Sequence, residues 1–160
     1  MLATDIMRKS FATIKSTASV LDAVRLLLET DQRGLPVIND SGDLIGIVSE
    51  GDLLHRDELG ISAPKVNWLE AVLGIEENNP ERARMRTLQV EALMSTSPVK
   101  VDSDASVDDV VAQMDLHNIG QVPVVSAGIV IGIVSRKELL VALERRLSQQ
   151  AETETNTAGS

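Results

Sequence analysis

The chain has 160 residues, a formal net charge of −9, one Trp, one Phe and no Tyr. This length suits one domain or two small repeats that share a core, and aliphatic side chains have to build that core. An acidic chain without aromatic platforms is poorly suited to nucleic acid, so we expect no such partner. Because the chain contains no Cys, disulfides and thiolate metal sites are excluded.

The predicted elements occur twice along the chain. Residues 3–7 (ATDIM) predict a short helical lead-in, and residues 90–94 (VEALM) are its copy. Residues 11–14 and 99–101 then predict short strands. Charged residues precede any apolar run and no apolar stretch is long enough to cross a bilayer, so we expect a cytoplasmic protein with no membrane partner.

An amphipathic helix follows each short strand. Ser19 and Ser106 are the predicted first caps, and each has an Asp three residues later, at Asp22 and Asp109. Apolar residues then recur at helical spacing, which predicts one buried face per helix. The faces contain Val20, Ala23, Val24, Leu27 and Leu28 in the first helix and Val107, Val110, Val111 and Met114 in the second.

Two further strands complete each repeat. Residues 33–38 (RGLPVI) and 120–125 (GQVPVV) predict strands in which a Pro near the start fits a sheet edge or a strand entry. Turn-forming residues follow at 39–42 and 126–128, so each of these strands is predicted to form a hairpin with the next one. The repeat unit is therefore strand, helix, strand, strand, helix.

The clearest repeat is GIVSEGDLL at 46–54, which returns as GIVSRKELL at 132–140. Each copy reads as the end of a buried strand, then a Ser, then a helix start with an acid three residues after the Ser. These polar residues could form a capping box, or the same helix start could face an anion such as a phosphate. Both interpretations stay open on the residues alone.

The remaining segments have no repeat partner. Residues 59–89 carry apolar side chains at helical spacing, which predicts a helical linker or insert. Residues 149–160 have too little apolar content to pack, which predicts a disordered tail. The predicted division is thus 1–58 for the first repeat and 90–148 for the second.

Together, the lead-ins ending in Met, the LPVI and VPVV strands and the GIVSxx(D/E)LL sequences resemble the cystathionine-β-synthase (CBS) domain. The resemblance covers both repeats. It implies an α+β fold in which two pseudo-symmetric β-α-β-β-α repeats form one module with two clefts. It also implies a homodimer and a regulatory role, in which the clefts bind adenosine-containing ligands.

The resemblance implies roles for individual residues. Ser49 matches a phosphate-contacting residue and Asp52 the acid that holds the ribose hydroxyls, and a carboxylate and a hydroxyl suit those tasks chemically. Ser135 matches in the second repeat, where Glu138 replaces the usual Asp with a longer arm. Arg136 is expected to border that cleft, where it is either a phosphate ligand or an ordinary solvated charge. The expected walls are Ser10, Phe11, Ala12, Leu35, Pro36 and Val37 in the first cleft, and Ser97, Pro98, Val99, Val122 and Pro123 in the second.

The sequence therefore predicts a regulatory module that is not an enzyme, requires no cofactor and contains no metal site of its own. Its expected ligand is AMP, ADP or ATP, with or without Mg2+, and its signal passes to a protein effector or an assembly. The alternatives are a structural or dimerisation module with empty clefts, a sensor of S-adenosylmethionine or NAD, and an enzyme acting on a nucleotide.

Overall fold

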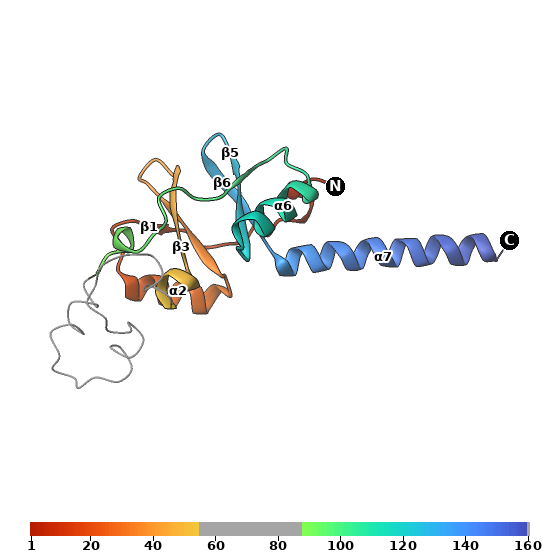
Figure 1. Cartoon of the computed structure of the whole chain (residues 1–160), viewed down its shortest axis with the longest axis horizontal. Helices are drawn as coiled ribbons and strands as arrows, with labels where there is room; N and C mark the ends of the chain where they lie inside the picture. The colour runs from red at the N-terminus through yellow and green to blue at the C-terminus, as the bar shows by residue number, and fades with distance from the viewer. Residues whose placement is uncertain (55–87, 160) are drawn as a thin grey trace, which may run out of the picture. The chain divides into compact units, whose positions relative to one another are not determined.

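A computed structural model describes residues 1–54 and 88–159, which form two compact units (Figure 1). The inner unit consists of Phe11–Pro98, and the outer unit combines Met1–Ser10 with Val99–Ser160. Each unit contains one three-stranded sheet, in the orders β1-β2-β3 and β4-β5-β6. The chain therefore has the predicted α+β fold with tandem repeats.

The two sheets have the same topology. In the inner unit β1 pairs in parallel with β2, and β2 pairs antiparallel with β3; β4, β5 and β6 repeat this arrangement in the outer unit. The predicted hairpins are confirmed. The inner elements are β1 (Ile14–Lys15), α2 (Val20–Thr30), β2 (Gly34–Ile38), β3 (Leu44–Ser49), α3 (Glu50–Leu54) and the 3-10 helix η2 (Val90–Ala92). The outer elements are α1 (Ala3–Ile6), β4 (Val101–Asp102), α6 (Val107–His117), β5 (Gln121–Ser126), β6 (Ile129–Ser135) and α7 (Arg136–Ala158).

The two repeats exchange their lead-ins. Arg8, which follows α1, forms two backbone hydrogen bonds with Ile133 of β6, at N···O distances of 2.8 and 3.0 Å. Ser95, which follows η2, forms the equivalent pair with Ile47 of β3, at 2.8 and 3.0 Å. Each lead-in thus extends the sheet of the other repeat, so the sequence period (1–58 and 90–148) and the compact units divide the chain differently.

Side-chain caps set the starts of α2 and α6, as predicted. The hydroxyl oxygens of Ser19 and Ser106 accept bonds from the backbone N–H groups of Asp22 and Asp109, both at 3.1 Å. The Asp109 carboxylate also accepts from the Ser106 N–H at 3.0 Å, which completes a capping box. The hydrogen bond from the Ser106 backbone and, second, that from the Ser106 side chain hold the pKa of the Asp109 carboxyl below its usual range.

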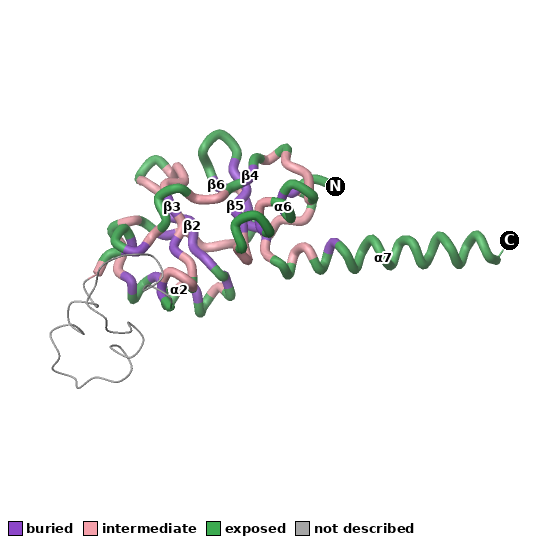
Figure 2. The backbone as a smooth tube through the Cα atoms, viewed as in Figure 1, coloured by how far each residue is buried: buried purple, intermediate pink, exposed green. Residues whose placement is uncertain are grey.

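The predicted helix faces are buried only in part (Figure 2). Val20, Ala23 and Leu27 enter the inner core, whereas Leu28 is 80% exposed. In α6, Val110 and Met114 are buried and Val111 is 39% exposed. The core residues of the inner unit are Ile14, Val20, Ala23, Leu27, Leu35, Val37, Val48, Leu53, Val90 and Leu93. Those of the outer unit are Ala3, Val101, Val110, Met114, Val122, Val124 and Val134.

Pro36 and Pro123 lie in central strands, so the interpretation as edge strands is wrong. Pairing of β2 with β1 begins only at Val37, and pairing of β5 with β4 only at Val124. Each Pro therefore lies before the part of its strand that has neighbours on both sides. At that earlier position the missing N–H is tolerated. The prediction of a strand entry fits this position.

The structure differs from the prediction of a disordered tail. Helix α7 continues to Ala158, although every residue from 143 to 159 is exposed. A helix that has already been nucleated extends at little cost through residues such as Ala, Gln and Glu. Thr153 and Thr155 also donate hydrogen bonds to the carbonyl groups four residues earlier. The predicted helical linker at 59–89 lies, except for its last two residues, outside the described residues.

Candidate functional site

The loop from β3 to α3 joins Ser49 and Asp52 in a reciprocal pair. The Ser49 N–H donates to Oδ2 of Asp52 at 2.8 Å, and the Asp52 N–H donates to Oγ of Ser49 at 3.2 Å. Both residues are half-buried. The structure therefore contains the predicted capping box, and it presents a carboxylate and a hydroxyl side by side at a partly open surface.

The corresponding pair in the outer unit is bonded differently. The Ser135 N–H donates to Oε2 of Glu138 at 2.8 Å, and the Ser135 hydroxyl donates to the same carboxylate oxygen in a short hydrogen bond. Ser49 uses its hydroxyl oxygen as an acceptor, whereas Ser135 uses its hydroxyl as a donor. The longer Glu side chain thus accepts a hydrogen bond from the Ser135 hydroxyl. The Ser49 hydroxyl, by contrast, can still donate to another acceptor.

Glu138 also faces a small cavity of about 220 Å³ in the outer unit. Residues of α1 and of the turn after it line one side, and α7 lines the other with groups of both charges. The sequence did not indicate this cavity, because α1 belongs to the other repeat. Its lining consists of Asp5, Ile6, Met7, Lys137, Glu138, Val141, Ala142 and Arg145.

Gln32, which the sequence analysis does not single out, is a buried polar residue that positions the backbone of its neighbours. Its side chain is only 5% exposed and holds the backbone of Ala12, a predicted wall residue. Oε1 accepts from the Ala12 N–H at 2.6 Å, and Nε2 donates to the carbonyl groups of Ala12 and Gly34, both at 3.1 Å. These bonds fix residue 12 beside the start of β2. No motif or periodicity marks Gln32, and Ile119 stands at the equivalent place in the second repeat.

The predicted wall residues have different degrees of exposure. Leu35, Val37 and Val122 expose no surface and belong to the hydrophobic cores, whereas Ser10 and Ser97 are exposed. The inner unit contains Phe11, Ala12, Leu35, Pro36, Val37, Ser49, Asp52, Ser97 and Pro98. The outer unit contains Ser10, Val99, Val122, Pro123, Ser135, Arg136 and Glu138. Their role in binding a ligand stays a prediction.

The family of the chain follows from comparison with known proteins. The family model of the CBS domain matches residues 3–58 and 90–145. These segments contain both Ser-x-x-acid pairs and both three-stranded sheets. The chain therefore belongs to the CBS-domain family and carries two copies of the domain.

Three known proteins are similar to this chain. Protein MJ1426 of Methanocaldococcus jannaschii is 30% identical over 154 residues, which cover 89% of this chain and 91% of that protein. A solved structure of CBSX2 in complex with AMP is 29% identical to this chain, with a TM-score of 0.67. The match covers 90% of this chain and 96% of the chain in that structure. CBSX2 is a chloroplastic protein of Arabidopsis thaliana, and this chain spans 64% of its full length. The CBS domain pair of protein MJ0100 was solved with 5-methylthioadenosine and S-adenosylmethionine, and it has a TM-score of 0.66 against this chain. It is 23% identical, and the match covers 91% of this chain and 98% of that one.

Two further properties concern the described residues alone. Among residues 1–54 and 88–159, no helix is both long enough and apolar enough to cross a membrane. The same residues contain no group of three or more His, Asp or Glu side chains that could hold a metal ion.

Proposed function

We propose that this protein is a non-catalytic regulatory module that binds an adenosine nucleotide, of the AMP, ADP or ATP class, and passes the signal to a partner protein. The observation that carries this proposal is the Ser49–Asp52 pair at the start of α3. The similarity to CBSX2, which was solved in complex with AMP, supports the choice of nucleotide. We keep the cytoplasm as its expected compartment.

The chemistry of the pair suits both ends of a nucleotide. In the described structure Asp52 uses only Oδ2, so Oδ1 can accept hydrogen bonds from ribose hydroxyl groups. The Ser49 oxygen accepts from the backbone, and its hydroxyl hydrogen can donate to a phosphate oxygen. Gln32 holds the Ala12 segment in a fixed position, which lowers the entropy cost of forming a wall for the base.

The proposed sites are unequal. Ser135 already donates its hydroxyl proton to Glu138, so a phosphate would have to displace an internal hydrogen bond. Both bonds to Glu138 end on Oε2, so Oε1 is as open to ribose as Oδ1 of Asp52, and the difference between the two pairs lies in the Ser hydroxyl. We therefore propose stronger nucleotide binding by the first repeat.

Calorimetric titration of the whole protein tests this function. AMP, ADP and ATP, each with and without Mg2+, should bind to the natural chain. Asp52→Ala should weaken this binding by roughly tenfold or more, because a hydrogen bond to a charged group contributes about 1.5–3 kcal/mol. Glu138→Ala should have a smaller effect. Ser19→Ala is the control: like Asp52→Ala it removes a capping residue in the inner unit, so it should lower stability by about 0.5–2 kcal/mol without changing affinity.

Other outcomes would assign the protein differently. Binding of S-adenosylmethionine or NAD in place of the three nucleotides would change the ligand class. Absence of binding by every adenosine ligand would favour a structural or dimerisation module. Conversion of a bound nucleotide would contradict the non-catalytic role.

A further inference from the structure

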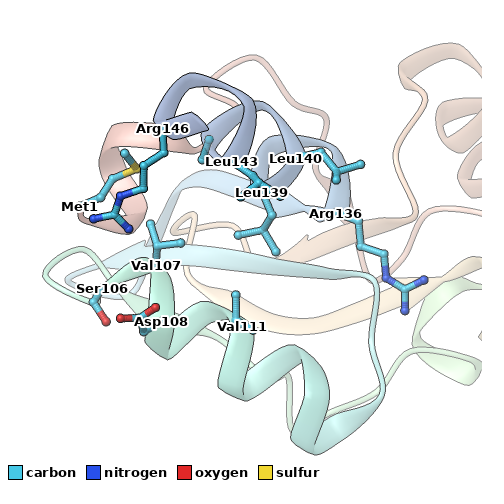
Figure 3. A pocket seen from close by; sticks show the side chains of 11 residues that line it. Met1, Ser106, Val107, Asp108, Val111, Arg136, Leu139, Leu140, Leu143 and Arg146 are labelled. Carbon is cyan, nitrogen blue, oxygen red and sulfur yellow. The ribbon is translucent and has the colours of Figure 1, made fainter. Parts of the chain in front are cut away.

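A large apolar groove and a smaller charged cavity lie on different sides of α7 in the outer unit. The groove, of about 550 Å³, lies between α6 and α7, and Leu139, Leu140 and Leu143 contribute to its walls (Figure 3). This apolar surface suits the homodimer that the family resemblance implies. The cavity of about 220 Å³ shares only Ala142 with the groove and faces α1 instead. Its polar groups make it the better candidate for a small-molecule site.

The cavity is distinct from the two predicted clefts. Of the predicted site residues it includes only Glu138, and neither Ser135 nor any expected wall residue lines it. Its volume also lies below the range of about 300–1,000 Å³ that is typical of sites for drug-sized ligands. The cavity therefore suits a molecule smaller than a nucleotide.

Four charged side chains line the cavity, and their formal charges cancel. Asp5 belongs to α1, and Lys137, Glu138 and Arg145 belong to α7. In the described structure none of these four groups forms an ion pair with another of them. An anion alone or a cation alone would meet like charge in this lining. A small ligand that carries both a positive and a negative group is therefore complementary to it.

Both acids are held in place with one oxygen to spare. Oδ2 of Asp5 accepts from the Leu2 N–H at 2.8 Å, and Oδ1 has no partner in the described structure. The two bonds to Glu138 end on Oε2, so Oε1 is open as well. The two bases, Lys137 and Arg145, lie about two turns apart on α7. The cavity thus presents free acceptors and free cationic donors to the same small volume.

We propose that this cavity binds a free α-amino acid with an aliphatic side chain. The open oxygens of Asp5 and Glu138 accept hydrogen bonds from the ammonium group of the ligand. The carboxylate of the ligand pairs with Arg145, because a guanidinium group can bind both of its oxygens at once. The aliphatic side chain packs against Ile6 and Val141, which line the same cavity. This binding does not depend on the proposed nucleotide site.

Titration of the full chain with L-leucine, followed by NMR without nucleotide, tests the ligand class. Leucine should shift the amide signals of residues 5–7 and 137–145 and bind with a Kd of about 1 mM or tighter. Isoamylamine lacks the carboxylate and 4-methylpentanoate lacks the ammonium group, so each should bind at least about tenfold more weakly. Equal affinity for all three compounds, or no shift with about 10 mM leucine, would overturn the proposal.

Two charge-removing variants test the location. Arg145→Gln and Asp5→Asn should each weaken leucine binding by about fivefold or more, since each removes one charged partner. Asp5→Asn keeps a side-chain oxygen that can accept from the Leu2 N–H, so α1 should remain folded. The matched control is Arg146→Gln, on the same helix but lining the groove and not the cavity, which should leave the affinity unchanged. An equal loss in Arg146→Gln would show a general charge effect and contradict the site.

Glu138 connects the cavity with the second nucleotide site, and this consequence rests on the proposed function. Leucine bound to Oε1 of Glu138 should weaken binding of AMP by the second repeat and leave binding by the first repeat unchanged. Calorimetric titration of AMP into the leucine-saturated protein measures both affinities. If AMP does not bind at all, the proposed function fails while the leucine titration still decides the cavity. Two AMP affinities that leucine leaves unchanged would contradict the shared use of Glu138.

Discussion

Gln32 holds Ala12 through both polar atoms of its side-chain amide: Oε1 accepts from the Ala12 N–H at 2.6 Å, and Nε2 donates to the Ala12 carbonyl at 3.1 Å. A side chain thus replaces the neighbouring strand that would normally satisfy this backbone. β1 contains only Ile14 and Lys15, whereas the sequence predicts residues 11–14, and β4 (Val101–Asp102) is equally short. The second repeat has Ile119 at the same place and lacks this device.

Replacing Gln32 by Leu should destabilise the inner unit. The substitution leaves the N–H and carbonyl of Ala12 without their partner, and an unsatisfied buried polar group costs about 1–3 kcal/mol. Urea unfolding monitored by circular dichroism measures the change. The same substitution at the exposed Gln149 of α7 should change stability by less than about 0.5 kcal/mol. Equal effects at the two positions would show that the bonds to Ala12 contribute no stability.

Shortening Glu138 to Asp should strengthen binding of AMP by the second repeat. An Asp at this position can adopt the geometry of Asp52, which leaves the Ser135 hydroxyl proton available to a phosphate. We expect a gain in affinity of about three- to tenfold in calorimetry, equivalent to about 0.7–1.4 kcal/mol. The reverse change, Asp52→Glu, should weaken the first site. If Glu138→Asp leaves binding unchanged, the bonding of Ser135 does not limit that site.

The two glycines beside the exchanged lead-ins should tolerate Ala differently. A β-carbon on Gly46 would lie 2.6 Å from the carbonyl oxygen of Ser95, a backbone atom, whereas the three atoms nearest to one on Gly132 belong to the side chain of Met7. Gly46→Ala should therefore cost about 1–3 kcal/mol of stability, and Gly132→Ala less. Met7→Ala combined with Gly132→Ala should remove that clash. Denaturation midpoints of these variants rank the costs, and a larger loss for Gly132→Ala would contradict the prediction.

Stability in acid should depend on Asp109. Its pKa is lowered in the folded protein by the hydrogen bonds from Ser106, so its contribution is complete above its unfolded pKa of about 3.9 and is lost as the pH falls through the folded value. Asp109→Asn should therefore flatten the decline in melting temperature at the acid end of a pH series. Asp104→Asn, at an exposed carboxylate that makes no capping bond in the described structure, is the control. Parallel curves for Asp109→Asn and the natural chain would refute the linkage.

The sequence predicted those features that short segments determine. The caps at Ser19 and Ser106, the hairpins and the start of α3 follow from a few adjacent residues, and the internal repeat reinforced each of them. The bonds of Gln32 to Ala12 span 20 residues without a pattern, so composition and periodicity could not show them. The same holds for Glu138, whose hydrogen bond to the Ser135 hydroxyl depends on side-chain length and rotamer.

The length of α7 illustrates a different limit. The residues after Ser148 lack apolar side chains for packing, and this was correctly read as an absence of core contacts. The same residues, however, have adequate helix propensity, and a packed helix precedes them. At the end of an established helix, residues that make no core contacts can therefore still be helical.

The exchange of lead-ins also constrains the order in which the chain can fold during synthesis. The inner unit is one continuous segment, Phe11–Pro98, and it leaves the ribosome complete before most of the outer unit exists. Ala3, which is fully buried against the start of α6, and Arg8, which pairs with Ile133, have to wait for partners made about 100 residues later. Residues 1–10 are thus made before the inner unit but find their partners only after it, when β6 emerges.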